Sequence, residues 1–136
     1  MSYELRSHTA DVAVAATGET LAETVAAVAD GLAAASCEEI HDVGERFPVA
    51  VTAESPEALL FDYLDELIYE RDVRGVLPVD NRGTVEETAE GWRFSGTYRG
   101  VPLSAVTARD LKAVTYSEME ISETDDGWSL YVVFDV

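Results

Sequence analysis

The chain has 136 residues and a formal net charge of −18, from 27 acidic and 9 basic side chains. This length indicates a single domain, 1–136, that can bury a core without disulfides or a structural metal. The hydrophobic share of 47% and the aromatic share of 9% exclude a disordered tail and a collagen-like chain. No apolar run approaches the roughly 18 residues that a membrane span needs.

The acidic surplus favours adaptation to a salty cytoplasm, as in haloarchaea, over a role in binding cations or a basic partner. At molar salt the Debye length falls to about 3 Å and screens the self-repulsion of such a chain. The charge also argues against direct binding of DNA or RNA, which normally needs a basic patch. The first ten residues, MSYELRSHTA, lack the basic and apolar parts of a secretory signal. We therefore expect a halophilic, cytoplasmic protein with no membrane partner.

The beginning of the chain predicts two strands and then a helix. Residues 2–6 and 12–16 are short segments typical of strands. Thr20 and Glu23 form a predicted capping box, in which each side chain accepts a hydrogen bond from the other residue's backbone N–H. Apolar residues then recur at helical spacing and predict a helix over 21–35.

The middle of the chain predicts a strand over 46–53 and a second helix that runs to about Arg71. The segment Ser55–Glu57 favours a helix start, with serine as the N-cap, proline at the first helical position and an acid in the first turn. Its expected core face consists of Leu59, Leu60, Tyr63, Leu64, Leu67, Ile68 and Tyr69. Its expected solvent face consists of Asp62, Asp65, Glu66 and Glu70.

The rest of the chain predicts mainly strands. They are expected at 76–80, 84–89, 92–98, 119–123 and 128–136, with a further short apolar run at 112–116. The predicted turns are Asn81–Gly83, Glu90–Gly91 and Asp125–Gly127. This order of elements indicates an α+β fold, with two helices packed on a largely antiparallel or mixed β-sheet in one compact domain.

Generic catalytic motifs are missing from the sequence: it has no P-loop, no C-x-x-C and no H-E-x-x-H. Cys37, His8 and His41 are the only nitrogen and sulfur ligands that zinc would favour, and a zinc site prefers more of them. Cys37 and His41 both fall after the first predicted helix. They are better explained as residues of a helix end and loop than as a catalytic dyad.

Carboxylates are the remaining candidates for chemistry. Asp11 follows the interruption between the first two strands, and Asp135 precedes the terminal carboxylate of Val136 at the end of an apolar strand. Hard cations take oxygen ligands of this kind. Two interpretations follow from the spacing: a divalent cation that joins the three groups, if Asp11 lies on a neighbouring strand, or an acidic cap on a frayed chain end.

Five segments together make the chain resemble the archease family. They occur in the family's order and extend from one end of the chain to the other. They are His8–Asp11, Gly18–Leu21, Glu57–Tyr69, Lys112–Tyr116 and Val132–Val136.

The resemblance implies a function as a protein cofactor and not as an enzyme. Archeases activate the RtcB-type tRNA-splicing RNA ligase by promoting its guanylylation and its multiple turnover, and they can broaden its nucleotide choice. The partner is therefore the ligase, with tRNA contacted only indirectly. By motif match, Asp11, Asp135 and Val136 hold a divalent cation, with calcium expected and magnesium or manganese as alternatives.

Lys112 is the only lysine of the chain, and its place in the family motif favours a contact with the ligase, its nucleotide or a carboxylate of the cation site. His8 is expected to orient the loop before Asp11 or to contact the partner, and not to bind the cation. The stretch 100–111 departs from the family, in which many members carry a longer loop with a histidine. The alternatives are a stand-alone metal-dependent phosphohydrolase and a general chaperone.

Overall fold

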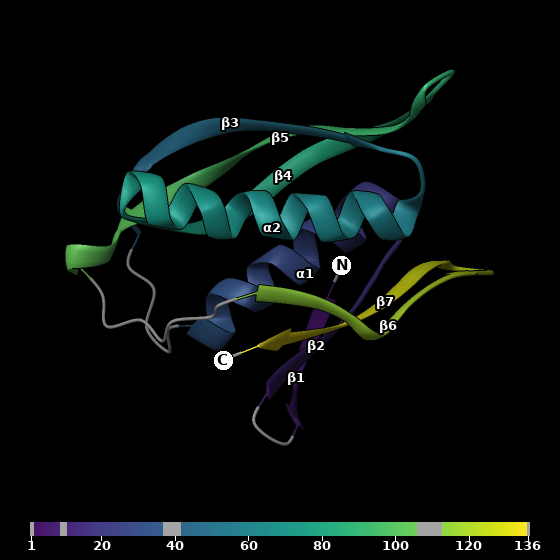
Figure 1. Ribbon diagram of the computed structural model, residues 1–136, viewed down its shortest axis with the longest axis horizontal. Helices are drawn as coiled ribbons and strands as arrows, with labels where there is room; N and C mark the ends of the chain where they lie inside the picture. Colours follow the sequence, from purple (N-terminus) through teal and green to yellow (C-terminus); the bar gives the residue numbers. More distant parts are fainter. Residues whose placement is uncertain (1, 9–10, 37–41, 106–112, 136) are drawn as a thin grey trace.

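The computed structural model describes residues 2–8, 11–36, 42–105 and 113–135. These residues form two α-helices, seven strands and one short 3-10 helix (Figure 1). In chain order the elements are β1 (Ser2–His8), β2 (Asp11–Gly18), α1 (Leu21–Ser36), β3 (Glu45–Ala53), α2 (Pro56–Arg74), β4 (Val76–Thr88), β5 (Gly91–Pro102), η1 (Leu103–Ala105), β6 (Ala113–Thr124) and β7 (Gly127–Asp135).

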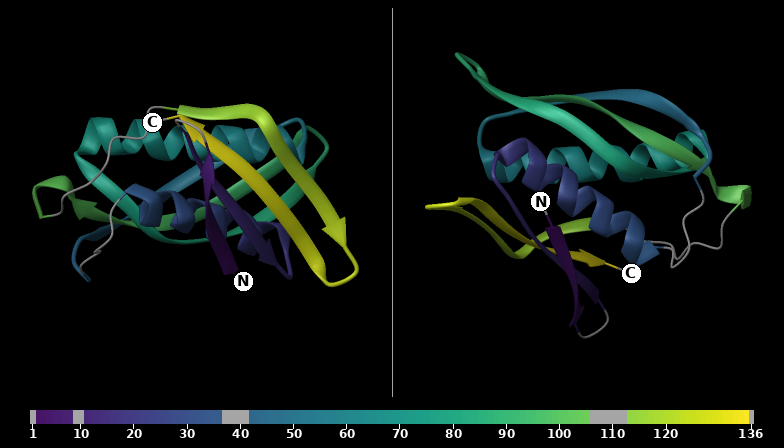
Figure 2. Two further views of the ribbon diagram at one scale, coloured as in Figure 1. Left: turned by 90° about the horizontal axis from the view of Figure 1, so that it is seen from below. Right: turned by 180° about the vertical axis from the view of Figure 1, so that it is seen from behind.

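The strands of the described residues form two antiparallel sheets, not one. The first sheet has four strands in the order β1-β2-β7-β6, and the second has three in the order β3-β5-β4. Both helices lie between the two sheets, as the right-hand view of Figure 2 shows. The predicted α+β class, with two helices on antiparallel sheet, is confirmed. The apolar strand β7 is an interior strand, as its composition predicts.

The helix α1 contacts both sheets through small side chains. It packs against β1, β2 and β7 of one sheet and against β4 of the other. At Gly31 the approach is so close that a Cβ atom would lie 2.5 Å from a methyl carbon of Val14. The alanine-rich composition of α1 therefore allows it to fit between two sheets instead of covering a single one.

The start of α1 resembles the predicted capping box but differs in one bond. The Glu23 N–H donates to Thr20 Oγ1 at 3.1 Å, as predicted. The Glu23 carboxylate accepts from the backbone N–H of Glu19 at 3.2 Å, not from that of Thr20. The side chain thus reaches one residue further back and still satisfies an N–H group before the helix.

Helix α2 begins at the predicted N-cap, Ser55, and continues three residues beyond the predicted end at about Arg71. Ser55 Oγ accepts a hydrogen bond from the Ala58 N–H at 3.1 Å. Gly75 closes the helix with a left-handed φ of 65°, and its N–H donates to Arg71 O at 2.9 Å. A left-handed residue after the last turn is the usual C-terminal stop, and glycine adopts it without steric cost.

The predicted core face and solvent face of α2 agree with the structure, with two exceptions. Tyr63, Leu64 and Leu67 are fully buried, as predicted. Tyr69 was expected in the core but is 57% exposed. Glu70 was expected in solvent but is buried, because it accepts hydrogen bonds from Tyr98 Oη at 3.0 Å and from Arg74 Nε at 3.1 Å. A buried carboxylate is tolerated where such donors are supplied.

The predicted turn at Asn81–Gly83 is wrong. Strand β4 continues through this segment, and its pairing with β5 shifts register between Val79 and Arg82. Asp80 at the shift has a positive φ of 48°, which is a bulge conformation and not a chain reversal. Residues 113–116 of the predicted short run and the predicted strand at 119–123 likewise belong to the single strand β6, which has an irregular register between Thr115 and Glu120.

Candidate metal centre

The strand register of the four-stranded sheet aligns the residues that the sequence singled out. Asp11, the first residue of β2, is the Cα partner of Asp135, the last residue of β7. Asp11 is also paired with His8 of β1, and Asp135 is paired with Ala113 of β6. Directly opposed residues of antiparallel strands have Cα atoms about 4.5–5.5 Å apart. One row across the sheet thus joins positions from both ends of the chain.

The row lies at the end of a buried strand. Val132, Val133 and Phe134 of β7 are at most 1% exposed. Asp135 directly follows these buried residues and is paired with Asp11, the first residue of β2. The geometry satisfies the condition on which the cation hypothesis depended, that Asp11 come from a strand next to the chain end. Val136 and Lys112 adjoin this row in sequence but lie outside the described residues.

The nitrogen and sulfur ligands that the sequence offers, apart from His8, are Cys37 and His41. Cys37 and His41 both lie outside the described residues. In the part of the chain that the structure describes, no three His, Cys, Asp or Glu residues form a group that could hold a metal ion. Asp11 and Asp135 are paired positions on adjacent strands of that part.

A buried polar cluster at the β4 bulge is a feature that the sequence analysis missed. The backbone N–H and the Nδ2 of Asn81 both donate to Asp30 Oδ1 of α1, at 2.9 and 2.8 Å. Tyr63 Oη of α2 donates to Asn81 Oδ1 at 2.6 Å. Asn81 is only 3% exposed, and it therefore ties one strand to both helices. The Asn-Arg-Gly composition suggested a turn, and an aspartate within the apolar pattern of α1 was the one available sign of a polar partner.

Burial governs the ionisation of this cluster. It raises the pKa of Asp30, and the two hydrogen bonds from Asn81 oppose this shift. Burial also raises the pKa of Tyr63, which keeps its hydroxyl protonated as a hydrogen-bond donor. The polar groups of the cluster bond to one another and connect β4 to the two helices.

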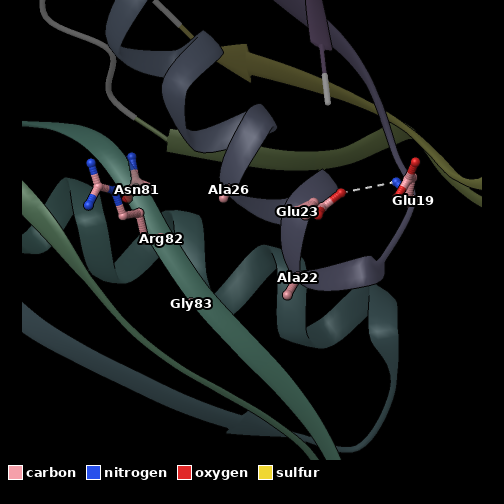
Figure 3. Close-up of a pocket in the computed structure, with 7 residues that line it drawn as sticks. All are labelled: Glu19, Ala22, Glu23, Ala26, Asn81, Arg82 and Gly83. Atoms are coloured by element: carbon pink, nitrogen blue, oxygen red, sulfur yellow. Dashed lines mark hydrogen bonds between the residues drawn. The ribbon is translucent and has the colours of Figure 1, made fainter.

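A groove lies beside this cluster, between α1 and β4 (Figure 3). Its volume is about 470 Å³. Ala22 and Ala26 of α1 line one wall, and the segment Asn81–Gly83 of β4 lines the other. Glu19 and Glu23 also line it, near the start of α1. The groove is separate from the row at Asp11, which stands at the opposite end of β2.

The fold and the paired acidic positions define a small acidic α+β protein in which two antiparallel sheets enclose two helices. The family described as the Archease protein family (MTH1598/TM1083) matches residues 3–136. The protein archease of Thermococcus gammatolerans is 34% identical over 143 residues, which is 98% of each chain. The protein archease of Pyrobaculum calidifontis is 32% identical over 145 residues, which is 99% of this chain and 95% of that one. The chain belongs to the archease family.

Solved structures agree with this assignment. The solution structure of Methanobacterium thermoautotrophicum protein 1598 has a TM-score of 0.85 and 27% identity, and the match covers 99% of both chains. A Thermotoga maritima protein described as "an archease, possible chaperone" has the same fold, with a TM-score of 0.66, 22% identity and 98% of both chains covered. Within the described residues, neither helix combines the length and the apolar character needed to cross a bilayer.

Proposed function

We propose that this protein activates the RtcB-type tRNA-splicing RNA ligase, promoting guanylylation of the ligase and its multiple turnover. Family membership over residues 3–136 supports this proposal. Its second support is the register that pairs Asp11 with Asp135. This pairing brings residues from both ends of the chain to one place, as the proposed cation site requires. In this view the protein is a cofactor of the ligase and has no turnover of its own.

The proposed cation ligands are Asp11, Asp135 and the terminal carboxylate of Val136. Positions paired across two strands are close enough for their carboxylates to share one ion, and oxygen donors of this kind suit calcium, with magnesium and manganese as alternatives. When bound, the cation would supply positive charge that stabilises negative charge developing on a transferred phosphoryl group. The protein's own contribution is to hold these carboxylates on a sheet whose strand β7 is rigidly packed.

Lys112 and His8 complete the proposed site. His8 is paired with Asp11, and Lys112 immediately precedes Ala113, which is paired with Asp135. An ammonium can bind a nucleotide phosphate or a ligase carboxylate as a compact point charge. We propose that Lys112 and His8 contact the ligase or its nucleotide and thereby broaden the range of nucleotides that the ligase accepts. The ligase makes all contacts to tRNA.

The test is ligase guanylylation at high salt with wild type, Asp11→Asn and a matched control. Asp125→Asn makes the same change at an exposed hairpin turn, and it should stimulate the ligase like wild type. Asp11→Asn should stimulate it roughly 10–100-fold less, which is the usual effect of a lost interaction around a metal. Equal stimulation by both variants would remove the cation from the mechanism.

Two further assays address the competing functions. Hydrolysis of phosphomonoesters or phosphodiesters by the protein without ligase would favour a metal-dependent phosphohydrolase. Suppression of aggregation of an unrelated denatured protein, with no stimulation of the ligase, would favour a chaperone. The proposal expects neither activity.

A further inference from the structure

The groove between α1 and β4 is formed by an edge strand and a helix. Strand β4 is at the end of the three-stranded sheet, so one side of its backbone is not paired with another strand. Along the first turns of α1, the small side chains of Ala22 and Ala26 leave space next to Gly83 of β4 (Figure 3). A cleft between an edge strand and a helix is a common place for an extended peptide to add as a further strand.

The hydrogen bonds of Asn81 show which way this edge faces. Its backbone N–H points away from β5 and donates to Asp30 of α1. Successive residues of a strand direct their N–H and C=O groups to alternate sides, so Gly83, two residues on, also faces the groove. Thr88 and Gly91 flank the two-residue turn between β4 and β5 and form a hydrogen-bonded pair, so the alternation along the ladder makes Gly83 and Gly96 a non-hydrogen-bonded pair. The N–H and C=O of Gly83 therefore point away from β5, as strand addition requires.

The charges on the two walls indicate the chemistry of the occupant. Glu19 and Glu23 have exposed side chains at the α1 wall. Arg82 on the opposite wall already donates to Asp80 Oδ2 at 2.9 Å, which partly neutralises it. The groove thus carries two carboxylates where α1 begins, of which that of Glu23 also accepts from the Glu19 N–H. Basic side chains complement them.

We propose that the groove binds an extended, basic segment of the RNA ligase, which pairs with the backbone of β4 at Gly83. The identity of the partner rests on the proposed function, whereas the mode of binding rests on the groove. The site is distinct from the paired acidic positions. From Asp11 to Gly18, strand β2 spans seven steps of about 3.4 Å, so its two ends are roughly 24 Å apart.

Backbone amide exchange tests the pairing directly. The full-length protein is mixed with the ligase of the same organism, and hydrogen–deuterium exchange is followed along both edges of the three-stranded sheet. Exchange at Gly83 and Val85 of β4 should slow about tenfold or more, because a paired amide is protected. Exchange along β3, the opposite edge of the same sheet, should not change.

Charge variants test the walls. Replacing Glu19 and Glu23 together by Gln keeps the Glu23 acceptor for the helix cap and removes two charges. Affinity for the ligase should fall roughly threefold to tenfold, the size of two partly exposed ion pairs. Glu57→Gln is the control, since it removes an exposed acid from the first turn of α2, and it should bind normally.

The outcomes separate this inference from the proposed function. Asp11→Asn should retain the protection of β4 while losing stimulation of the ligase. Wild type could stimulate the ligase without slower exchange along β4, or with equal slowing along β3. Either result overturns the proposed binding of a ligase segment in the groove and leaves the proposed function intact. A failure to form any complex with the ligase overturns both.

Discussion

Tyr63→Phe removes a single oxygen atom from the buried cluster at the β4 bulge. The Tyr63 hydroxyl donates to Asn81 Oδ1 at 2.6 Å, and both residues are at most 3% exposed. The phenylalanine ring keeps the contact with Phe94, whose centroid lies 4.3 Å away. The variant therefore leaves packing intact and leaves one buried amide oxygen without its donor. Such a loss lowers the free energy of unfolding by about 1–3 kcal/mol.

Urea unfolding at fixed salt measures this change, and thermal unfolding provides a second readout of roughly 3–5 °C per kcal/mol for a chain of this size. Tyr69→Phe on the same helix is the matched control. The Tyr69 side chain is 57% exposed, so its variant should unfold within about 0.5 kcal/mol of wild type. If Tyr63→Phe is as stable as Tyr69→Phe, the cluster does not hold the bulge in place.

Three further predictions follow from the charges and caps. Because burial raises the pKa of Asp30 on folding, ionisation of Asp30 destabilises the fold, and its contribution is lost as pH rises through the raised pKa. As pH rises from acid to 7, the free energy of unfolding of Asp30→Asn should therefore rise relative to that of wild type in urea titrations. A difference that does not change with pH would refute the raised pKa of Asp30. Calcium at about 100 times its dissociation constant should raise the free energy of unfolding by about 2.7 kcal/mol, and Asp135→Asn should lose this gain in a thermal shift assay. Gly75→Ala should cost about 1 kcal/mol in urea unfolding, since φ is 65° and a Cβ would contact nothing within 4 Å; Gly75→Asn should cost less.

Local chemistry explains which elements the sequence predicts well. Ser55 and Pro56 mark the start of α2, and the Asp-Asp-Gly sequence marks the last hairpin, where Thr124 is paired with Gly127. Each of these features depends on hydrogen bonds or backbone angles within a few residues. The sequence of each segment is therefore enough to predict these features.

Distant partners explain the errors. Asn81 was assigned to a turn because its neighbours favour one, but its partner Asp30 is 51 residues away in sequence. Glu70 was assigned to solvent because it is charged, but Tyr98, 28 residues away, donates to it inside the core. Local secondary-structure propensities carry no information about partners that are distant in sequence. Hydrogen bonds between such partners outweigh the propensities where both groups are buried.

The sequence alone determined the α+β class, the N-cap of α2 and the interior position of β7. The tertiary structure alone decided that the strands divide into two sheets, that β4 bulges without turning, and that Asp11 and Asp135 are paired. The physical reason is the distance along the sequence between the residues that interact. Helix caps and hairpin turns are stabilised by neighbours along the chain, whereas the order and register of strands depend on which apolar faces bury one another across the whole molecule.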